Sequence, residues 1–211
     1  MAFAAPTFQP LLLLVSGPAG SGKTTVCEGI LGRFRNPGTS PFSRGMKRVI
    51  TATTREPREN EAHGVDYYFF SEVEFRRHIE EGAFFEHAEV YQNLYGTLKS
   101  EIHQGFDSGL DLVLNIDVQG AATFREAAAR ETRLAGRLVT VFICPPDIDV
   151  LRNRLLQRGQ NDPEDLEHRL EIASREMEHR DQYDYTLPSA TPKQDLEALT
   201  CIFVAEKLKS T

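Results

Sequence analysis

The 211-residue sequence has few cysteines, and the three it has are scattered. Cys27, Cys144 and Cys201 are odd in number, and none belongs to a C-x-x-C pair. Disulfide frameworks and structural zinc sites both depend on regularly spaced cysteines. The sequence therefore excludes a fold held together by either, and we expect a reducing, cytoplasmic compartment.

The sequence also lacks an excess of basic residues and a long hydrophobic run. Lysine and arginine total 24 against 31 acidic residues, for a net charge of -7, which gives no general attraction to nucleic acid or anionic membrane. The first basic residue is Lys23, so no positive region of signal-peptide type is present, and no run reaches the roughly 20 apolar residues of a membrane span. We expect a soluble protein without nucleic-acid or membrane partners.

Short apolar runs alternate with longer amphipathic stretches along the chain. Their near-continuous apolarity indicates strands buried on both faces, and the alternation predicts an α/β fold of three layers, with a parallel central sheet and crossover helices. Strands are predicted at 11–16, 48–52, 111–117 and 138–144. Helices are predicted at 23–34, after Ser71 with its S-E-V-E capping box, after Thr97, and at 120–130, 147–158, 163–182 and 192–207.

Two segments interrupt this alternation. Residues 48–96 contain a charged loop and the apolar runs DYYFF and AFFEHAEVY, which we interpret as short strands around a helix in an inserted α+β lobe. The charged stretch at 152–169 joins two helices through glycine and proline, which predicts a mobile lid at about 147–170. Residues 1–47 and 97–211 then form the core, and the whole chain is a single domain.

The segment GPAGSGKTT has the G-x-x-x-x-G-K-T pattern of a phosphate-binding loop, between a predicted strand and a predicted helix. Its glycines let successive N–H groups face phosphate oxygens, and the helix adds its positive N-terminal end. In this pattern Lys23 reaches the terminal phosphates and the Thr24 hydroxyl binds Mg²⁺. The predicted binding residues are Gly17, Pro18, Ala19, Gly20, Ser21, Gly22, Lys23, Thr24 and Thr25.

Such a loop does not by itself separate a GTPase, an ATP-driven motor and a small-molecule kinase. A kinase needs an acceptor site as well. Arg55 and Arg58 lie three residues apart in TREPR, so both guanidinium groups can fork onto one phosphate. Tyr67 and Tyr95 offer phenolic donors beside them. These residues predict a second phosphate site on the inserted lobe.

Two acids, Glu86 and Asp117, are candidates for reading a base. A carboxylate accepts the N1–H and N2–H₂ groups of guanine as a matched pair, whereas adenine presents an acceptor at N1 and no exocyclic group at C2. The hydroxyls of Thr51 and Thr97 are candidates for the remaining polar edge. This set predicts selection of guanine over adenine.

Four segments resemble the successive signature segments of guanylate kinases, in the family's order and spacing and behind a matching phosphate loop. They are TATTREPRENEAHGVDYYFF, FFEHAEVYQNLYGT, LVLNIDVQGA and LRNRLLQRGQ. The resemblance extends from about residue 11 to the C-terminal FVAEKL. It implies ATP at the phosphate loop, GMP on the inserted lobe and a basic lid over both. The implied reaction is Mg²⁺-dependent transfer of the ATP γ-phosphoryl group to GMP, giving ADP and GDP, in purine nucleotide metabolism and GMP recycling.

The resemblance also implies roles residue by residue. The GMP phosphate is assigned to Arg55, Arg58, Tyr67 and Tyr95, and the guanine edge to Thr51, Glu86, Thr97 and Asp117. Catalysis is assigned to Lys23 and, from the lid and its following helix, to Arg154, Arg158 and Arg169. Phosphoryl transfer requires in-line positioning and positive charge around the moving group, which these residues would provide.

Two features depart from the family pattern. Asn115 stands where the family usually has an acid two residues before Asp117, and an amide supplies no counter-charge to Mg²⁺. After YDY, the chain reads TLPSATPKQ instead of an apolar strand ending in Asn-Asp. Pro188 is expected to end a strand or confine it to an edge. This turn lies near the adenine in relatives, so it bears on the choice of donor.

Two alternatives stay open from the sequence. One is a related kinase acting on another phosphorylated small molecule, such as ribose 1,5-bisphosphate. The other is a guanylate-kinase-like module that binds phosphopeptides without catalysis. Glu86, Asp117 and the intact TREPR segment favour a guanine acceptor, and Lys23 and Thr24 argue against a module that has lost its nucleotide loop.

Overall fold

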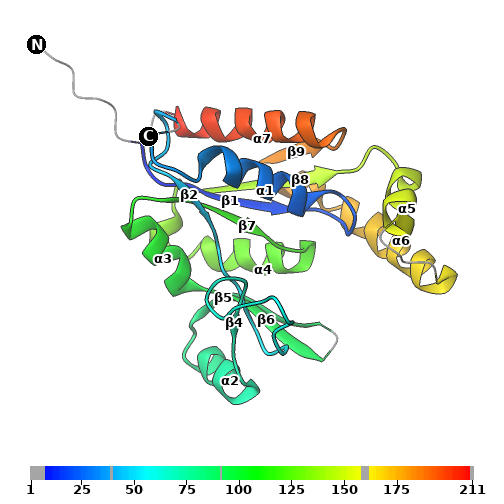
Figure 1. The fold of residues 1–211 in the computed structure, drawn as a ribbon, viewed down its shortest axis with the longest axis horizontal. Coiled ribbons are helices and arrows are strands. Elements are labelled where there is room, and N and C mark those ends of the chain that lie inside the picture. The colour runs from blue at the N-terminus through cyan, green and yellow to red at the C-terminus, as the bar shows by residue number, and fades with distance from the viewer. Residues whose placement is uncertain (1–7, 39, 91, 158–161, 210–211) are drawn as a thin grey trace, which may run out of the picture.

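The computed structural model describes residues 8–38, 40–90, 92–157 and 162–209. Figure 1 shows a central sheet between two layers of helices, a second sheet with its own helix to one side, and a pair of helices projecting from one end. This is the predicted α/β architecture of three layers. Within the described part of the chain, no helix is long and apolar enough to cross a membrane.

The central sheet has five parallel strands in the order β2-β7-β1-β8-β9. β1 lies in the middle, and its apolar run is explained by burial on both faces, with Leu13 and Val15 on one side and Leu12 and Leu14 on the other. As predicted, Pro188 ends a strand at the sheet edge, where its missing N–H is tolerated. The bounds are β1 (Leu12–Ser16), β2 (Met46–Arg48), β7 (Asp111–Asn115), β8 (Leu138–Cys144) and β9 (Tyr185–Pro188).

Two helices cover each face of this sheet (Figure 1). On one face, α1 (Lys23–Phe34) and α7 (Pro192–Lys207) pack together on β1, and both have the predicted bounds. On the other, α3 (Lys99–Asp107) and α4 (Val118–Ala128) enclose a core around Phe106 and Phe124. Because the five strands are parallel, their carboxyl ends lie at one edge of the sheet, where ligands bind in open α/β sheets.

The second sheet has the order β4-β3-β6-β5, and its helix packs on it through Phe75, whose ring stacks on Phe84 of the sheet. It comprises β3 (Ala52–Thr53), β4 (Tyr68–Phe69), β5 (Phe84–Val90), β6 (Asn93–Leu98) and α2 (Glu72–Glu80). The prediction of one strand at 48–52 was wrong. The chain leaves the central sheet after Arg48 and enters the second sheet at Ala52, so this stretch connects the two sheets.

The prediction also missed β6, because Gly96 weakens the strand pattern. In the structure, a Cβ at Gly96 would lie 2.9 Å from the backbone oxygen of Glu86 and 2.9 Å from the ring of Phe84. Glycine is required here for β5 and β6 to approach each other. The feature that obscured the strand in the sequence is therefore what permits its pairing.

The projecting pair consists of α5 (Ile148–Gln157) and α6 (Pro163–Met177). They pack through a small core of their own that includes Leu151, Leu155 and Leu166. The predicted helix at 163–182 was too long. It ends at Met177 because the chain turns back, through a 3₁₀ turn at Arg180–Gln182, to bury Tyr183 and begin β9. A further 3₁₀ turn lies at Thr132–Leu134.

A buried ion pair joins the last helix to the sheet. Lys207 Nζ donates to Asp111 Oδ1 at 2.8 Å and to the backbone oxygen of Gln9 at 2.5 Å. The two side chains are only 2% and 1% exposed. Asp111 also accepts from the backbone N–H of Leu11 and from Ser43 Oγ. Removing either partner would leave an uncompensated charge in the interior.

The predicted capping box at Ser71 is confirmed and gives a stability prediction. Ser71 Oγ accepts from the backbone N–H of Glu74, whose carboxylate accepts in return from the Ser71 N–H. We expect Ser71→Ala to lower the free energy of unfolding by about 1 kcal/mol, because the Glu74 N–H loses its acceptor and the Glu74 carboxylate loses the Ser71 hydroxyl as a donor. Chemical denaturation measures this. Ser174→Ala, at an exposed site inside α6, is the control, and equal unfolding free energies for both variants would contradict the assignment.

Candidate active site

The phosphate-binding loop connects β1 to α1 as predicted. Gly17, Gly20 and Gly22 have backbone φ values of 140°, 82° and 103°, which residues other than glycine rarely adopt. A Cβ at Gly17 would also lie 2.5 Å from the backbone oxygen of Ile143 at the end of β8. The loop therefore needs glycine both for its turn and for its close packing against the sheet.

Lys23 lies at the start of α1 and folds back over the loop. Its Nζ donates to the backbone oxygens of Gly17 at 2.7 Å and Pro18 at 3.0 Å. The neighbouring side chains of Thr24 and Thr25 are exposed at the mouth of the loop. The lysine ammonium and the first turn of α1 together place positive charge beside these hydroxyls.

A cavity of about 250 Å³ lies between the second sheet and the carboxyl end of β7. It brings together five of the predicted acceptor residues, which are Thr51, Tyr67, Glu86, Tyr95 and Asp117. Thr97 is buried behind the cavity and donates through its hydroxyl to Glu86 Oε1 at 2.6 Å. The cavity thus has a carboxylate on each of two elements, one on β5 and one at the start of α4.

The two carboxylates differ in their surroundings. Glu86 is 7% exposed, and burial raises its pKa to about 7, with a further increase from the charge of Asp117 and an opposing effect of the Thr97 hydroxyl. Asp117 accepts a hydrogen bond from the Gly120 N–H at 2.7 Å and so caps α4. Glu86 therefore titrates near neutrality, whereas Asp117 is fixed by the helix that it begins.

The two predicted phosphate-binding arginines are organised by Glu61, a residue that the sequence did not single out. Arg55 Nη2 lies 2.9 Å from each carboxylate oxygen of Glu61, and the Arg55 guanidinium covers the ring of Tyr67 at 5.6 Å. The Arg58 N–H donates to the same carboxylate, and this bond is the main cause that lowers the pKa of Glu61. The Arg58 side chain is exposed. The sequence signal that could have identified Glu61 is its place three residues after Arg58, within reach of the Arg58 backbone.

The structure brings one of the three predicted lid arginines to the phosphate loop. Arg154 on α5 donates to the Ser21 backbone oxygen at 3.2 Å and to Ser189 Oγ at 3.1 Å. Arg169 on α6 forms an ion pair with Asp165 of the same helix at 2.8 Å. Arg158 lies outside the described residues. Glu176 of α6 also lies within electrostatic range of the loop. Burial raises the pKa of its carboxyl group, the charge of Lys23 lowers this pKa, and the charge of Asp117 raises it.

On the other side of the loop, a cavity of about 270 Å³ is bounded by Gly20, Gly22, Thr25 and Arg154. Its far wall includes Ser189, Ala190 and Pro192, from the stretch that departs from the guanylate kinase pattern, and the following Asp195. Buried Asp195 organises this wall by accepting from Ser189 Oγ at 3.0 Å and the Ala190 N–H at 2.7 Å. The altered segment therefore forms a defined surface beside the phosphate loop.

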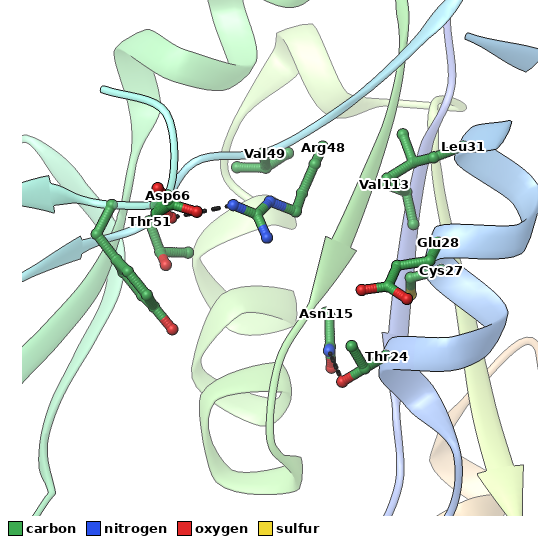
Figure 2. Close-up of a pocket in the computed structure, with 11 residues that line it drawn as sticks. Thr24, Cys27, Glu28, Leu31, Arg48, Val49, Thr51, Asp66, Val113 and Asn115 are labelled. Carbon is green, nitrogen blue, oxygen red and sulfur yellow. Dashed lines mark hydrogen bonds between the residues drawn. The ribbon is translucent and has the colours of Figure 1, made fainter. Parts of the chain in front are cut away.

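A third cavity, of about 100 Å³, lies between α1 and the chain that connects the two sheets (Figure 2). Asn115 Nδ2 donates to Thr24 Oγ1 across it at 3.2 Å. Arg48, at the end of β2, donates to the backbone oxygens of Val65 and Asp66. Glu28 extends into the same space from α1. Sequence reasoning missed Glu28 and Arg48, although Glu28 stands one helical turn after Thr24.

Comparison with known proteins identifies the family that this sequence resembles. The family model described as guanylate kinase matches residues 9–206. A guanylate kinase of Caldanaerobacter subterraneus subsp. tengcongensis is 36% identical over 201 residues, covering 95% of this chain and 90% of that protein. One of Wolbachia sp. subsp. Brugia malayi is 37% identical and covers 95% of each chain.

The solved structures include a similar fold. The crystal structure of guanylate kinase from Anaplasma phagocytophilum superimposes with a TM-score of 0.69 at 28% identity, covering 98% of this chain and 90% of that one. The family match and these relatives span nearly the whole chain, including both sheets and the phosphate loop. The chain therefore belongs to the guanylate kinase family of ATP:GMP phosphotransferases.

Proposed function

We propose that the protein transfers the γ-phosphoryl group of Mg-ATP to GMP, with GMP in the cavity at Glu86 and ATP at the phosphate loop. The observation that carries this assignment is that Thr51, Tyr67 and Asn115 line both the acceptor cavity and the cavity at Thr24. The two spaces share a wall. A phosphate held at Tyr67 is therefore on the side of the acceptor cavity that leads to the donor.

Guanine is selected in this proposal by the carboxylates of Glu86 and Asp117, with the hydroxyls of Thr51 and Thr97 at the remaining edge. An ionised carboxylate in a buried site accepts two N–H groups from guanine and finds no such pair on adenine. Thr97 is already bound to Glu86 at 2.6 Å, so it fixes the carboxylate in one orientation. This arrangement requires Glu86 to be deprotonated when GMP binds.

The GMP phosphate is assigned to Arg55, Arg58, Tyr67 and Tyr95. The Glu61 carboxylate holds the Arg55 guanidinium over the Tyr67 ring, which keeps the planar fork oriented before the substrate arrives. Arg58 is exposed, so its side chain is available to approach the same phosphate. Glu61 is thus a positioning residue for the acceptor arginines.

At the donor site, the loop residues Gly17–Thr25 surround the ATP phosphates with N–H groups and the positive end of α1. Lys23 now donates to two loop carbonyls, and it exchanges them for phosphate oxygens when ATP binds. The adenine is assigned to the cavity beside Ser189 and Ala190, next to Arg154.

The residues at the loop fit a magnesium ion that arrives with ATP. Thr24 Oγ1 is exposed and lies 3.2 Å from the Asn115 amide, and oxygen ligands of this kind suit Mg²⁺. The bound ion would neutralise charge on the donor phosphates. Thr24 is its proposed protein ligand, and the side chain of Asn115 can accept from its water.

Catalysis is assigned to Lys23, Arg154, Arg158 and Arg169, which spread positive charge around the group in transfer. The proposed units are a core of residues 1–47 and 97–211, a GMP-binding lobe at 48–96 and a lid at about 147–170. Closure of the lobe and lid would exclude water and favour transfer over hydrolysis. We place this reaction in the cytoplasm, in purine nucleotide metabolism.

The proposal predicts a sharp acceptor profile. In a coupled assay of ADP release with Mg-ATP, we expect rapid turnover with GMP and little with AMP, UMP, dTMP or ribose 1,5-bisphosphate, because only guanine pairs with both carboxylates. dGMP tests whether the ribose 2′-hydroxyl contributes, and a reaction without acceptor gives the hydrolysis background. Turnover only with the bisphosphate would transfer the assignment to the rival kinase, and none above background would favour the binding module.

A further inference from the structure

We propose that Glu28 supplies the negative charge toward the nucleotide-bound magnesium ion that Asn115, as an amide, does not. Glu28 is in this role a positioning residue, which holds water of the ion. The inference rests on the proposed function, in which Mg-ATP binds at Thr24. Figure 2 shows the Glu28 carboxylate extending from α1 into the space between Arg48 and Asn115, above Thr24.

The helix places Glu28 on the same face as the proposed magnesium ligand. Residues four apart on an α-helix are neighbours, with Cβ atoms about 5–6 Å apart, and each Cβ tilts toward the helix N-terminus. Glu28 therefore extends over the turn that carries Thr24. Both residues, with Asn115, line one cavity.

The neutral charge of Asn115 leaves a role for this carboxylate. Asn115 ends β7 next to the phosphate loop, paired with Val15 of β1. In P-loop enzymes Mg²⁺ is held by the loop hydroxyl together with an aspartate from a neighbouring strand. Asn115 can hydrogen-bond a water but adds no counter-charge. Glu28 is the nearest carboxylate on the helix that carries the hydroxyl.

The other acids near the loop either have a bonding partner already or do not line this cavity. Asp66 lines the cavity, but its Oδ2 accepts from the Ala62 N–H at 2.8 Å within its own loop. Glu176, on α6, does not line this cavity, and burial raises the pKa of its carboxyl group. Within the described residues, Glu28 makes no hydrogen bond or ion pair, so its charge is not neutralised by a protein partner.

Mn²⁺ binding in the presence of a non-hydrolysable ATP analogue tests the inference without turnover. Free and bound Mn²⁺ are separated by electron paramagnetic resonance. We expect Glu28→Gln to weaken Mn²⁺ binding about 10-fold, the lower end of the effect of removing an outer-shell partner. Glu80→Gln, the same change at an exposed site on α2, is the matched control and should leave the affinity unchanged.

A second background makes the test specific. In Asn115→Asp protein, where the strand carries its own charge, we expect Glu28→Gln to change Mn²⁺ affinity by less than about 3-fold, because coupled sites are not additive. An equal loss in both backgrounds, or none in the native background, would overturn the inference. If the unmodified protein with the analogue binds no Mn²⁺, the proposed metal role fails along with it. GMP turnover would then still test the assignment of the substrates separately.

The unfolding free energy separates this role from a structural one. Arg48 lines the same cavity, although its guanidinium points toward Asp66 (Figure 2), and a stabilising attraction between the charges of Arg48 and Glu28 is the competing explanation. In that case Glu28→Gln would lower the unfolding free energy of the nucleotide-free protein and leave Mn²⁺ affinity intact. We expect the reverse, with an unchanged unfolding transition and a weaker metal complex.

Discussion

Lys23→Met is expected to lower kcat with GMP by about 10³-fold, the scale of removing one preorganised charge from a transition state. Methionine keeps most of the length of the side chain and removes the ammonium group. Because the charge is needed most when the γ-phosphoryl group is in transfer, we expect kcat to fall far more than the KM for GMP rises. Steady-state kinetics with Mg-ATP and GMP measures both.

Lys23 also holds the empty loop, through Gly17 and Pro18. The unfolding transition of the variant must therefore be recorded beside its kinetics. Lys209→Met, at an exposed site after α7, removes the same charge far from the loop and serves as the matched control. A loss in kcat below tenfold, in a variant that unfolds like the unmodified protein, would show that Lys23 does not act on the transferring group.

Glu86→Gln is expected to lower kcat/KM for GMP by at least about 10²-fold while leaving the affinity for ATP unchanged. The substitution turns one acceptor into an N–H₂ donor that faces the N–H groups of guanine, and a buried mismatch of this kind leaves polar groups unpaired. Glu89→Gln, three residues along β5 and exposed, is the matched control. Equal weakening of GMP and ATP would refute the assignment of Glu86 to the acceptor base.

The pKa of Glu86 adds a pH dependence to this result. Burial raises that pKa to about 7 from the ordinary value of 4.5, so the carboxylate that accepts from guanine is lost as the pH falls through 7. The KM for GMP should rise on acidification, and Glu86→Gln should abolish this part of the profile. Stability has the opposite sign, because the protonated side chain favours the folded state below about pH 4.5 and this contribution disappears as the pH rises through 7.

Local patterns allowed the position of the phosphate loop and the bounds of the nearby helices to be predicted from the sequence. α1 begins at Lys23 because the glycine turn ends there, and α7 begins at Pro192 because proline suits the first helical turn. Both are determined by neighbours in the sequence. The same holds for the capping box at Ser71.

The acceptor half depends on contacts between distant segments, which a local pattern does not contain. The importance of Gly96 appears only when β5 and β6 are paired. In the sequence Glu61 is one of several charges in a loop of both signs, and only the structure shows that it lies against Arg55. The stretch from Arg48 to Ala52 reads as one strand, because its branched residues favour strands whichever sheet receives them. Tertiary pairing decides each of these cases.

The buried pair of Lys207 and Asp111 has a consequence for how the chain is made. The partners are separated by 96 residues, so at a synthesis rate of about 5–20 residues per second Lys207 is added roughly 5–20 seconds after Asp111. Until then Asp111 has no counter-charge, and burying it in the central sheet is unfavourable. The phosphate loop is made early, but the sheet that supports it is complete only when nearly the whole chain has left the ribosome. Release of shortened chains would therefore yield unstable protein rather than a smaller working enzyme.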